Sequence, residues 1–317
     1  MTDALEFSRR GDEVFGRLAA CFPDAVKKRL LVEQRLPTDR FEAIRASMLG
    51  YLARCVGSDA PLTEAQLCER LLVQRHHLAN YRTDGMMMPK REHVAEWNLL
   101  HKAVAASFRD FGIEAQVDVI DVPFNVRVVY GEPLPGRSSI AYASSKVHSD
   151  VWAGVPPDAV VVVLPVLGAI EHITIEAGEM AREQELAAMR VFSDYDQGNR
   201  EHPYVEKYAD VAMKRGHVYL ADCRGLHNTV RYKREGVRVS IDFRFRLNDP
   251  GYRAMVPEVR GPESMDTRLA YRDWLDLGCE RAIVFDDRVA DARDAADTGP
   301  GVPFGVPHRL VDLFPAR

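Results

Sequence analysis

The stretch Val237-Arg-Val-Ser-Ile-Asp-Phe-Arg-Phe-Arg-Leu247 alternates apolar and polar residues from end to end. A period of two predicts a β-strand, because successive side chains of a strand point to opposite faces. The apolar face needs a cover, whereas the polar face carries three arginines that cannot lie unpaired in an apolar core. We therefore expect a strand of a small barrel, with a wet ligand cavity inside and packed helices outside.

The region from residue 112 to residue 247 predicts further strands, because short apolar runs rich in β-branched residues follow one another closely. These strands are expected at Ala115–Ile120, Asn125–Tyr130, Ile140–Ser144, Ala159–Leu164, Glu171–Glu176, Met189–Phe192, His217–Ala221 and Leu226–Val230. Many short strands at close spacing are typical of a sandwich or a barrel.

The first 111 residues have a different period. Apolar residues recur there at helical spacing, as in the stripe formed by Val94, Trp97, Leu100, Val104 and Phe108. The whole pattern predicts an α+β fold. Its core would be a double-stranded β-helix, or jelly roll, covered on the outside by N-terminal helices.

We expect a single domain over residues 1–317, a length that one large domain can have. The helical cover would occupy residues 1–111, the jelly-roll core residues 112–247, and a C-terminal arm residues 248–317. An insertion is expected near residues 179–211, where it would form a lid or the contact of a homodimer.

Composition excludes several classes of protein. The net charge of −5 gives no basic footprint for nucleic acid. No apolar run reaches the length of a membrane span, and the polar, acidic N-terminus is unlike a signal peptide. The five cysteines include no Cys-x-x-Cys pair, which indicates reduced thiols. We therefore expect a cytoplasmic protein with no nucleic-acid or membrane partner.

His148-Ser149-Asp150 and the distant His227 could form a metal site. Two histidines and one carboxylate are the ligands of the facial triad that binds Fe(II) and leaves positions open for O₂ and a cosubstrate. His148 and Asp150 are two residues apart, so an extended chain would direct both side chains to one side. His-x-Asp alone is a weak signal. The alternative is a surface His-x-Asp and a structural His227.

Ten residues separate His227 from the pair Arg238-Val-Ser240. The pattern His-x10-Arg-x-Ser is expected about 0.04 times by chance in this composition, so its presence is informative. Arg238 offers a planar fork for a carboxylate, and Ser240 offers a second hydrogen bond. The two could bind the far carboxylate of 2-oxoglutarate. The alternative for Arg238 is a structural ion pair with a neighbouring acid.

Zinc could also occupy the three ligands, since histidine and carboxylate do not exclude it. Arg238 favours iron, because a zinc hydrolase has no use for 2-oxoglutarate. Three hypotheses therefore compete: an iron oxygenase, a zinc hydrolase or metal-dependent sugar isomerase on the same barrel, and a sugar-binding jelly roll without catalysis.

The motif His-x-Asp…His-x10-Arg-x-Ser resembles that of the Fe(II)/2-oxoglutarate-dependent oxygenases. The stretch from His148 to Gly154, with Pro156 to Ala159 and the valine run that follows, resembles oxygenases of aminoglycoside antibiotic pathways, of the streptomycin and hygromycin type. The narrower resemblance covers residues 140–247. The resemblance implies Fe(II), 2-oxoglutarate and O₂ as cofactor and cosubstrates, with succinate as a product. It also implies an amino-sugar substrate that undergoes hydroxylation, desaturation or an oxidative ring closure such as orthoester formation.

Two further residues are candidates for substrate binding. Asp242 shares the polar strand face of Arg238 and Ser240, and its carboxylate could pair with an ammonium group of an amino sugar. The alternative is an internal ion pair with Arg244 or Arg246. Trp152, two residues after Asp150, is the second candidate for contact with the substrate.

Overall fold

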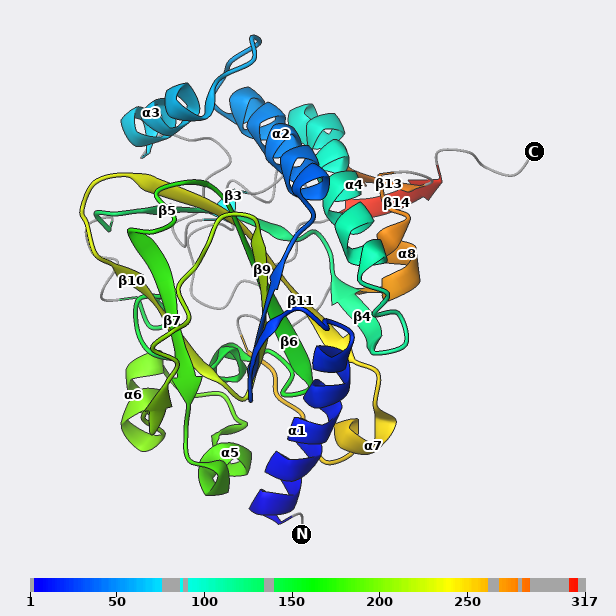
Figure 1. Cartoon of the computed structure of the whole chain (residues 1–317), viewed down its shortest axis with the longest axis vertical. Helices are drawn as coiled ribbons and strands as arrows, with labels where there is room; N and C mark the ends of the chain where they lie inside the picture. Colours follow the sequence, from blue (N-terminus) through cyan, green and yellow to red (C-terminus); the bar gives the residue numbers. More distant parts are fainter. Residues whose placement is uncertain are drawn as a thin grey trace.

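The computed structural model describes residues 3–75, 86–87, 91–133, 140–261, 268–278, 281–285 and 308–312. In this part of the chain helices surround sheets in which every strand pairing is antiparallel (Figure 1). The helices are α1 (Ala4–Ala20), α2 (Thr38–Cys55), α3 (Glu64–Gln74), α4 (Val94–Asp110), α5 (Arg182–Ala188), α6 (Tyr195–Glu201), α7 (Pro250–Arg253) and α8 (Tyr271–Leu275).

The described strands form a large sheet of nine strands, a sheet of three and a separate pair. The large sheet runs in the order β1 (Val26–Lys28), β2 (Leu31–Arg35), β9 (His217–Asp222), β6 (Ala159–Gly168), β11 (Val237–Leu247), β4 (Val117–Asp121) and β12 (Arg268–Ala270), and β5 (Asn125–Tyr130) joins β3 (Met86–Met87) to β11. The small sheet runs β10 (Leu226–Arg231), β7 (Ile173–Glu179) and β8 (Glu206–Lys207), and β13 (Arg281–Phe285) pairs with β14 (His308–Asp312).

The strand predicted from the alternating stretch is confirmed with the same bounds, as β11. One edge of β11 pairs with β6, from Arg238 opposite Gly168 to Arg246 opposite Ala159. The other edge pairs with β5 and then with β4. β11 is thus an interior strand of the large sheet, and its polar face is enclosed rather than exposed to bulk solvent.

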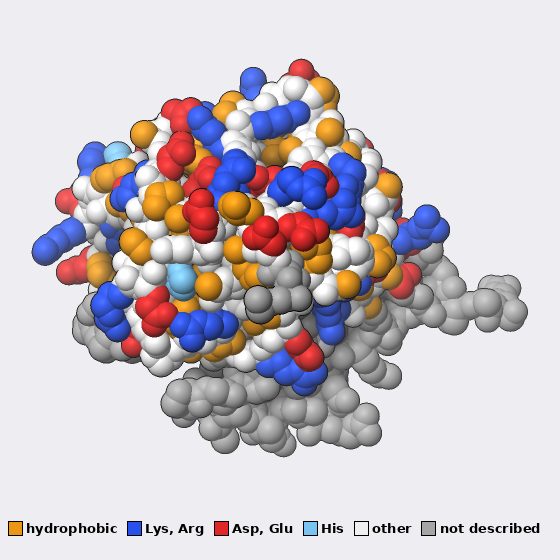
Figure 2. All heavy atoms as spheres, turned by 90° about the horizontal axis from the view of Figure 1, so that it is seen from below, with side chains coloured by type: hydrophobic (Ala, Val, Ile, Leu, Met, Phe, Trp, Pro, Cys, Tyr) orange, Lys and Arg blue, Asp and Glu red, His pale blue; other side chains and the backbone are white. Residues whose placement is uncertain are grey.

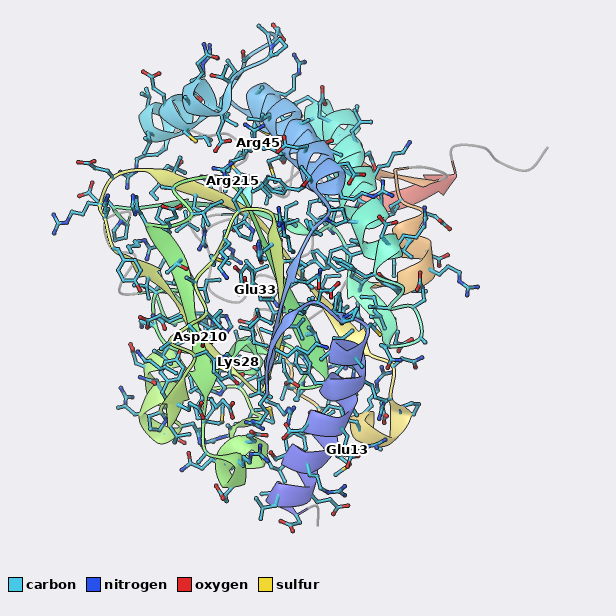
Figure 3. The ribbon with its side chains drawn as sticks, viewed as in Figure 1. Glu13, Lys28, Glu33, Arg45, Asp210 and Arg215 are labelled. Carbon is cyan, nitrogen blue, oxygen red and sulfur yellow. The ribbon has the colours of Figure 1, made fainter. Side chains whose placement is uncertain are left out.

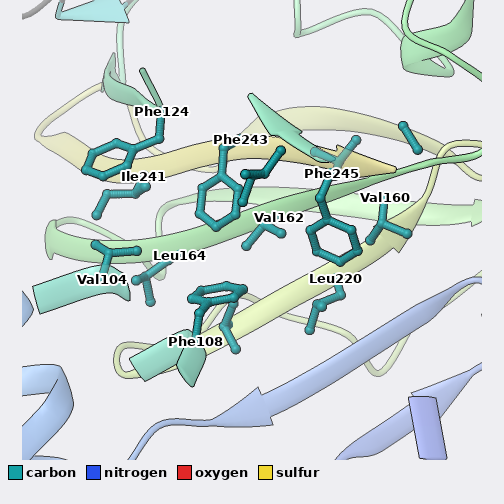
Figure 4. Packing of buried hydrophobic residues seen from close by; sticks show 14 of the residues in the cluster. Val104, Phe108, Phe124, Val160, Val162, Leu164, Leu220, Ile241, Phe243 and Phe245 are labelled. Atoms are coloured by element: carbon teal, nitrogen blue, oxygen red, sulfur yellow. The ribbon is translucent and has the colours of Figure 1, made fainter. Parts of the chain in front are cut away.

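The apolar face of β11 packs on helix α4 in the main core (Figure 4). The Phe243 ring meets the Phe108 ring edge to face, with centroids 5.1 Å apart. Ile241 and Phe245 are completely buried on the same face. Burying a phenylalanine of this kind stabilises the fold by roughly 1.5–3 kcal/mol. The alternation of β11 is therefore explained by helix packing on one face and a polar interior on the other.

Part of the sequence-based assignment is wrong. Residues 26–28 and 31–35 form strands β1 and β2 inside the segment predicted to be helical, because Leu31 and Val32 extend the large sheet beside β9. Residues 140–144 and 189–192 form no strand. The segment of residues 179–211, which is expected from the sequence to be an insertion, contains the short helices α5 and α6, which the sequence did not predict.

Glu64 joins the helical layer to the large sheet. Thr63 caps α3, so Glu64 is the first residue of this helix. The Glu64 carboxylate accepts hydrogen bonds from Arg45 of α2 (3.0 Å), from Arg215 (2.7 Å) and from the backbone N–H of Gly168 at the end of β6 (2.9 Å). Figure 3 labels Arg45 and Arg215 on the two sides of this junction.

The surface carries charges of both signs. On the face drawn in Figure 2, acidic and basic side chains lie intermingled, with no broad area of one sign. One such contact is the ion pair between Lys28 and Asp210 (2.7 Å), which links β1 to the segment before β9 (Figure 3). In the described part of the chain, no helix combines the length and the apolar character that crossing a membrane requires.

Candidate metal centre

Backbone pairing between two distant segments brings His148 and His227 together. His148 N donates to His227 O (2.9 Å), and His227 N donates to His148 O (2.8 Å), so the two form an isolated antiparallel bridge. His227 lies in β10, where it stands opposite Ala177 of β7. The centroids of the two imidazole rings are 4.3 Å apart as a result.

Asp150 reaches the same place through a turn. The sequence predicted extended chain from His148 to Asp150, but a short 3-10 helix, η3 (Asp150–Ala153), begins at the aspartate. Ser149 caps this helix, and its hydroxyl donates to Cys223 O at 2.6 Å. The turn still directs the carboxylate of Asp150 toward the two histidines.

The three side chains form a compact ligand set. Asp150 Oδ1 lies 3.4 Å from His148 Nε2 and 3.6 Å from His227 Nε2. One possible ligand atom from each residue lies within 4.8 Å of the other two. Metal–ligand bonds of about 2.0–2.2 Å place neighbouring ligand atoms roughly 3 Å apart, so small adjustments would let all three bind one ion. Among the residues that the structure describes, this is the group with such spacing.

Contacts around the triad hold His148 and Asp150 in orientation. His148 Nδ1 lies 2.7 Å from Lys146 O, which leaves Nε2 for the metal. Arg244 Nε donates to Asp150 Oδ2 at 3.2 Å, which leaves Oδ1 facing the histidines. Outer partners of this kind fix the tautomer and the direction of metal ligands.

The electrostatics keep two of the ligands in metal-binding forms. Burial, together with the neighbouring His148, lowers the pKa of His227 to about 3. Burial alone would raise the pKa of Asp150, but the Arg244 guanidinium and a hydrogen bond with His148 bring it well below its usual range. At neutral pH the site therefore presents a neutral imidazole and a carboxylate, as metal binding requires.

The triad lines a cavity between the two sheets, here called the main cavity. The described residues that line it are Arg127, Ile140, Tyr142, Ala143, Ser144, His148, Asp150, Val161, Val163, Ile175, Tyr195, His227, Thr229, Arg238, Ser240, Asp242 and Arg244. Both the large sheet, through β5, β6 and β11, and the small sheet, through β7 and β10, contribute to its wall. The predicted pair Arg238 and Ser240 thus shares one cavity with the triad.

Arg238 is a buried cation without a carboxylate partner among the described residues. Its side chain is 1% exposed, and its Nε has no hydrogen-bond partner. Its Nη1 donates to Ile173 O (2.9 Å) and Met213 Sδ (3.3 Å). Burial, together with the cations Arg127 and Arg231, lowers the pKa of Arg238 to about 9. A guanidinium in this state fits an anionic ligand with oxygen acceptors, such as the distal carboxylate of 2-oxoglutarate.

Asp242 has an internal partner, but a different one from those considered in the sequence. Arg127 of β5 donates to both carboxylate oxygens of Asp242, at 2.9 and 3.0 Å, and Asn125 donates at 3.3 Å. Arg246 pairs with Asp158 instead. Arg244 donates to Asp150, and its charge also helps to lower the pKa of Asp242. Arg127 was missed, although the alternation of β5 places it on a polar face between Val126 and Val128.

Trp152 requires a correction. Its ring is completely buried, it meets the Phe192 ring edge to face at 5.4 Å, and it packs against Gly198 of α6. It is absent from the described wall of the main cavity. The 3-10 turn that directs Asp150 into the cavity sends Trp152 into the core, so this side chain packs rather than contacts substrate.

The segment of residues 179–211 reaches the site through α6. The Tyr195 ring stacks on the His148 imidazole, with centroids 4.0 Å apart and an interplanar angle of 13°. Lys146 pairs with Asp196 at 2.6 Å and fixes α6 beside the triad. No pattern in the sequence pointed to Tyr195, because this contact depends on how α6 packs beside the triad.

No family model and no curated protein matches the chain. Among solved structures, it is similar to the non-heme alpha-ketoglutarate-dependent epimerase SnoN from nogalamycin biosynthesis, at 14% identity and TM-score 0.39, covering 82% of this chain and 99% of that one. It is also similar to the alpha-ketoglutarate-dependent carbocyclase SnoK from the same biosynthesis, at 12% identity and TM-score 0.36, covering 93% and 95%.

A third similar structure is an N-substituted L-amino acid dioxygenase from Burkholderia ambifaria AMMD, in complex with alpha-ketoglutarate. The identity is 12% and the TM-score 0.31, with 74% of this chain and 91% of that one covered. All three TM-scores lie below 0.5, so these similarities do not establish a function for this chain.

Proposed function

We propose that the protein is an Fe(II)- and 2-oxoglutarate-dependent oxygenase whose two sheets correspond to the halves of a double-stranded β-helix. His148, Asp150 and His227 would hold the iron on one face. The ion would supply the redox chemistry of O₂ activation, coupled to decarboxylation of 2-oxoglutarate to succinate. The observation that carries the proposal is the buried guanidinium of Arg238, which has an unpaired Nε in the cavity of the triad.

The protein's own residues have separate tasks in this proposal. Arg238 and Ser240 would bind the distal carboxylate of 2-oxoglutarate and so orient its other end toward the iron. Arg244 would hold Oδ2 of Asp150, so that this ligand presents a single oxygen. Tyr195 would restrict movement of His148 and exclude water from that side of the ring.

Anaerobic titration with Fe(II) and 2-oxoglutarate tests the proposal. A weak visible charge-transfer band should appear only when both are present, because it arises from the chelate of cosubstrate and metal. The same titration with Arg238→Met should leave metal binding intact and abolish the band at cosubstrate concentrations that saturate the wild type. Metal binding without any response to 2-oxoglutarate would instead favour a zinc hydrolase or a metal-dependent isomerase. No metal binding at all would favour a sugar-binding jelly roll.

For the substrate we propose a polyhydroxylated, amine-bearing sugar, as in aminoglycoside biosynthesis. The support is the sequence resemblance of residues 140–247. Hydroxylation or an oxidative ring closure, such as orthoester formation, would be the outcome. Asp242 is held by Arg127, so an ammonium group bound there would have to compete with that guanidinium. Succinate release in the presence of a panel of amino sugars, compared with neutral sugars of equal size, tests the substrate class.

A further inference from the structure

A second, apolar pocket adjoins the main cavity and is here called the side pocket. The described residues that line it are Leu31, Val161, Val163, Ile175, Ala177, Val211, Met213, Tyr219, Ala221 and His227. Four of these, namely Val161, Val163, Ile175 and His227, also line the main cavity. The two spaces therefore share a wall, and that wall includes one of the proposed metal ligands.

The side pocket offers water few hydrogen-bond partners. Among the residues of its described wall, only His227 and Tyr219 carry a nitrogen or oxygen atom in the side chain. The Tyr219 hydroxyl is engaged, because it accepts from Lys214 N (2.8 Å) and donates to Ala212 O (2.9 Å). An ordered water needs two to four polar partners, so a wall with few of them disfavours water and favours an apolar molecule such as xenon.

The main cavity has the opposite character. Arg127, Arg238, Asp242 and Arg244 contribute charged groups to its wall. Water and ionic ligands are stabilised beside such groups, whereas an apolar gas gains nothing from them. Of the two adjoining spaces, the side pocket is therefore the one that favours a small apolar molecule.

We propose that the side pocket holds dioxygen next to the metal centre, an inference that rests on the proposed oxygenase function. Its volume of about 40 Å³ exceeds the roughly 10–15 Å³ that one water-sized molecule needs, so a diatomic gas fits. Contact with His227 places the gas at the wall of the metal site. Met213 lines the side pocket, and its sulfur accepts a hydrogen bond from Arg238. The side pocket therefore also adjoins the residue proposed to bind 2-oxoglutarate.

Xenon binding tests the pocket without requiring activity. Xenon NMR of the full chain should show a saturable shift in the wild type. Ala221→Leu, on β9, should remove the shift by filling the space. Val211→Phe fills the pocket from a different segment and covers the case in which Ala221→Leu fails to fold. Ala103→Leu, at a partly buried alanine of α4, is the matched control and should keep the shift. A shift that is absent in the wild type, or unchanged in both filling variants, would overturn the proposal.

The dependence of succinate release on O₂ tests the role of the gas. Each filling variant should raise KM for O₂ by about threefold or more, with kcat and KM for 2-oxoglutarate near those of Ala103→Leu, as expected when only binding of one reactant is lost. Xenon binding with an unchanged KM for O₂ would overturn the assignment to dioxygen. If no variant or wild-type protein turns over or chelates 2-oxoglutarate, the oxygenase function itself fails and the dioxygen role with it. Xenon binding would then stand as a separate result.

Discussion

Arg244 Nε lies 3.2 Å from Oδ2 of Asp150, while Oδ1 of the same carboxylate faces both imidazoles at 3.4 and 3.6 Å. One oxygen is thus neutralised by a cation of the chain, and the other is directed to the metal position. Both side chains are nearly buried, at 11% and 6% exposure, so the charge of Asp150 depends on Arg244 whenever no metal is bound.

Arg244→Leu should destabilise the metal-free protein and make it depend on metal. Loss of one partner from a buried ion pair costs roughly 3–5 kcal/mol, and a bound dication would replace the missing charge. Melting temperatures with and without Co(II) measure this. Arg246→Leu is the matched control, because Arg246 pairs with Asp158 outside the triad (2.8 Å) on the same strand face. If Co(II) raised the melting temperatures of both variants equally, Arg244 would not be acting as the charge partner that the metal replaces.

His227→Ala should abolish specific metal binding, because two ligands hold a divalent ion poorly. The loss of Co(II) affinity should exceed the roughly 10–100-fold that is typical when only an outer hydrogen-bond partner is removed. Co(II) absorption spectra of the metal-free protein measure the affinity. His202→Ala alters a buried histidine that is not part of the ligand group, and it should bind Co(II) like the wild type.

Arg238→Met should weaken 2-oxoglutarate binding and at the same time stabilise the free protein. The first effect corresponds to about 2–5 kcal/mol for truncating one side of a buried charge contact. The second follows because the variant removes a buried cation that has no carboxylate partner among the described residues. Calorimetric binding and the melting temperature measure the two effects. A lower melting temperature would indicate that Arg238 has a structural role.

Asp242→Asn should lower the melting temperature and leave the substrate KM nearly unchanged, because the variant leaves Arg127 without its bidentate partner. Kinetics with the identified substrate and thermal denaturation of the same variant measure both quantities. A raised substrate KM at an unchanged melting temperature would instead support the contact with a substrate ammonium group.

Glu64→Gln should reduce stability at neutral pH but not in acid. Burial by itself would raise the pKa of Glu64, but hydrogen bonds from Arg215, Gly168 N and Arg45 lower it to about 2, from 4.5. A lowered folded pKa contributes stability that is complete above pH 4.5 and is lost as the pH falls through about 2. Solvent screens these contacts because the carboxylate is partly exposed, so the contribution is roughly 1–2 kcal/mol. The unfolding free energies of the wild type and of Glu64→Gln should therefore converge as the pH falls from 7 to 2. A difference that stays constant over this range would contradict the lowered pKa of Glu64.

The sequence by itself determined the strand at Val237–Leu247 and the grouping of His148, Asp150 and His227. Alternation is a local property, because backbone geometry sends every second side chain to the same face. The spacing from His227 to Arg238 predicted that Arg238 lies near the triad, and the two share one cavity although β10 and β11 belong to different sheets.

Only the tertiary structure decided which groups meet across strands and sheets. Strand register sets Ser240 opposite Arg127, and the diagonal neighbour of Arg127 is then Asp242. The turn at Asp150 sends Trp152 into the core, although simple alternation would have kept both on one face. Periodicity fixes the face on which a side chain lies, but its partner comes from a segment far away in sequence. The register and packing that bring that segment opposite depend on the whole fold.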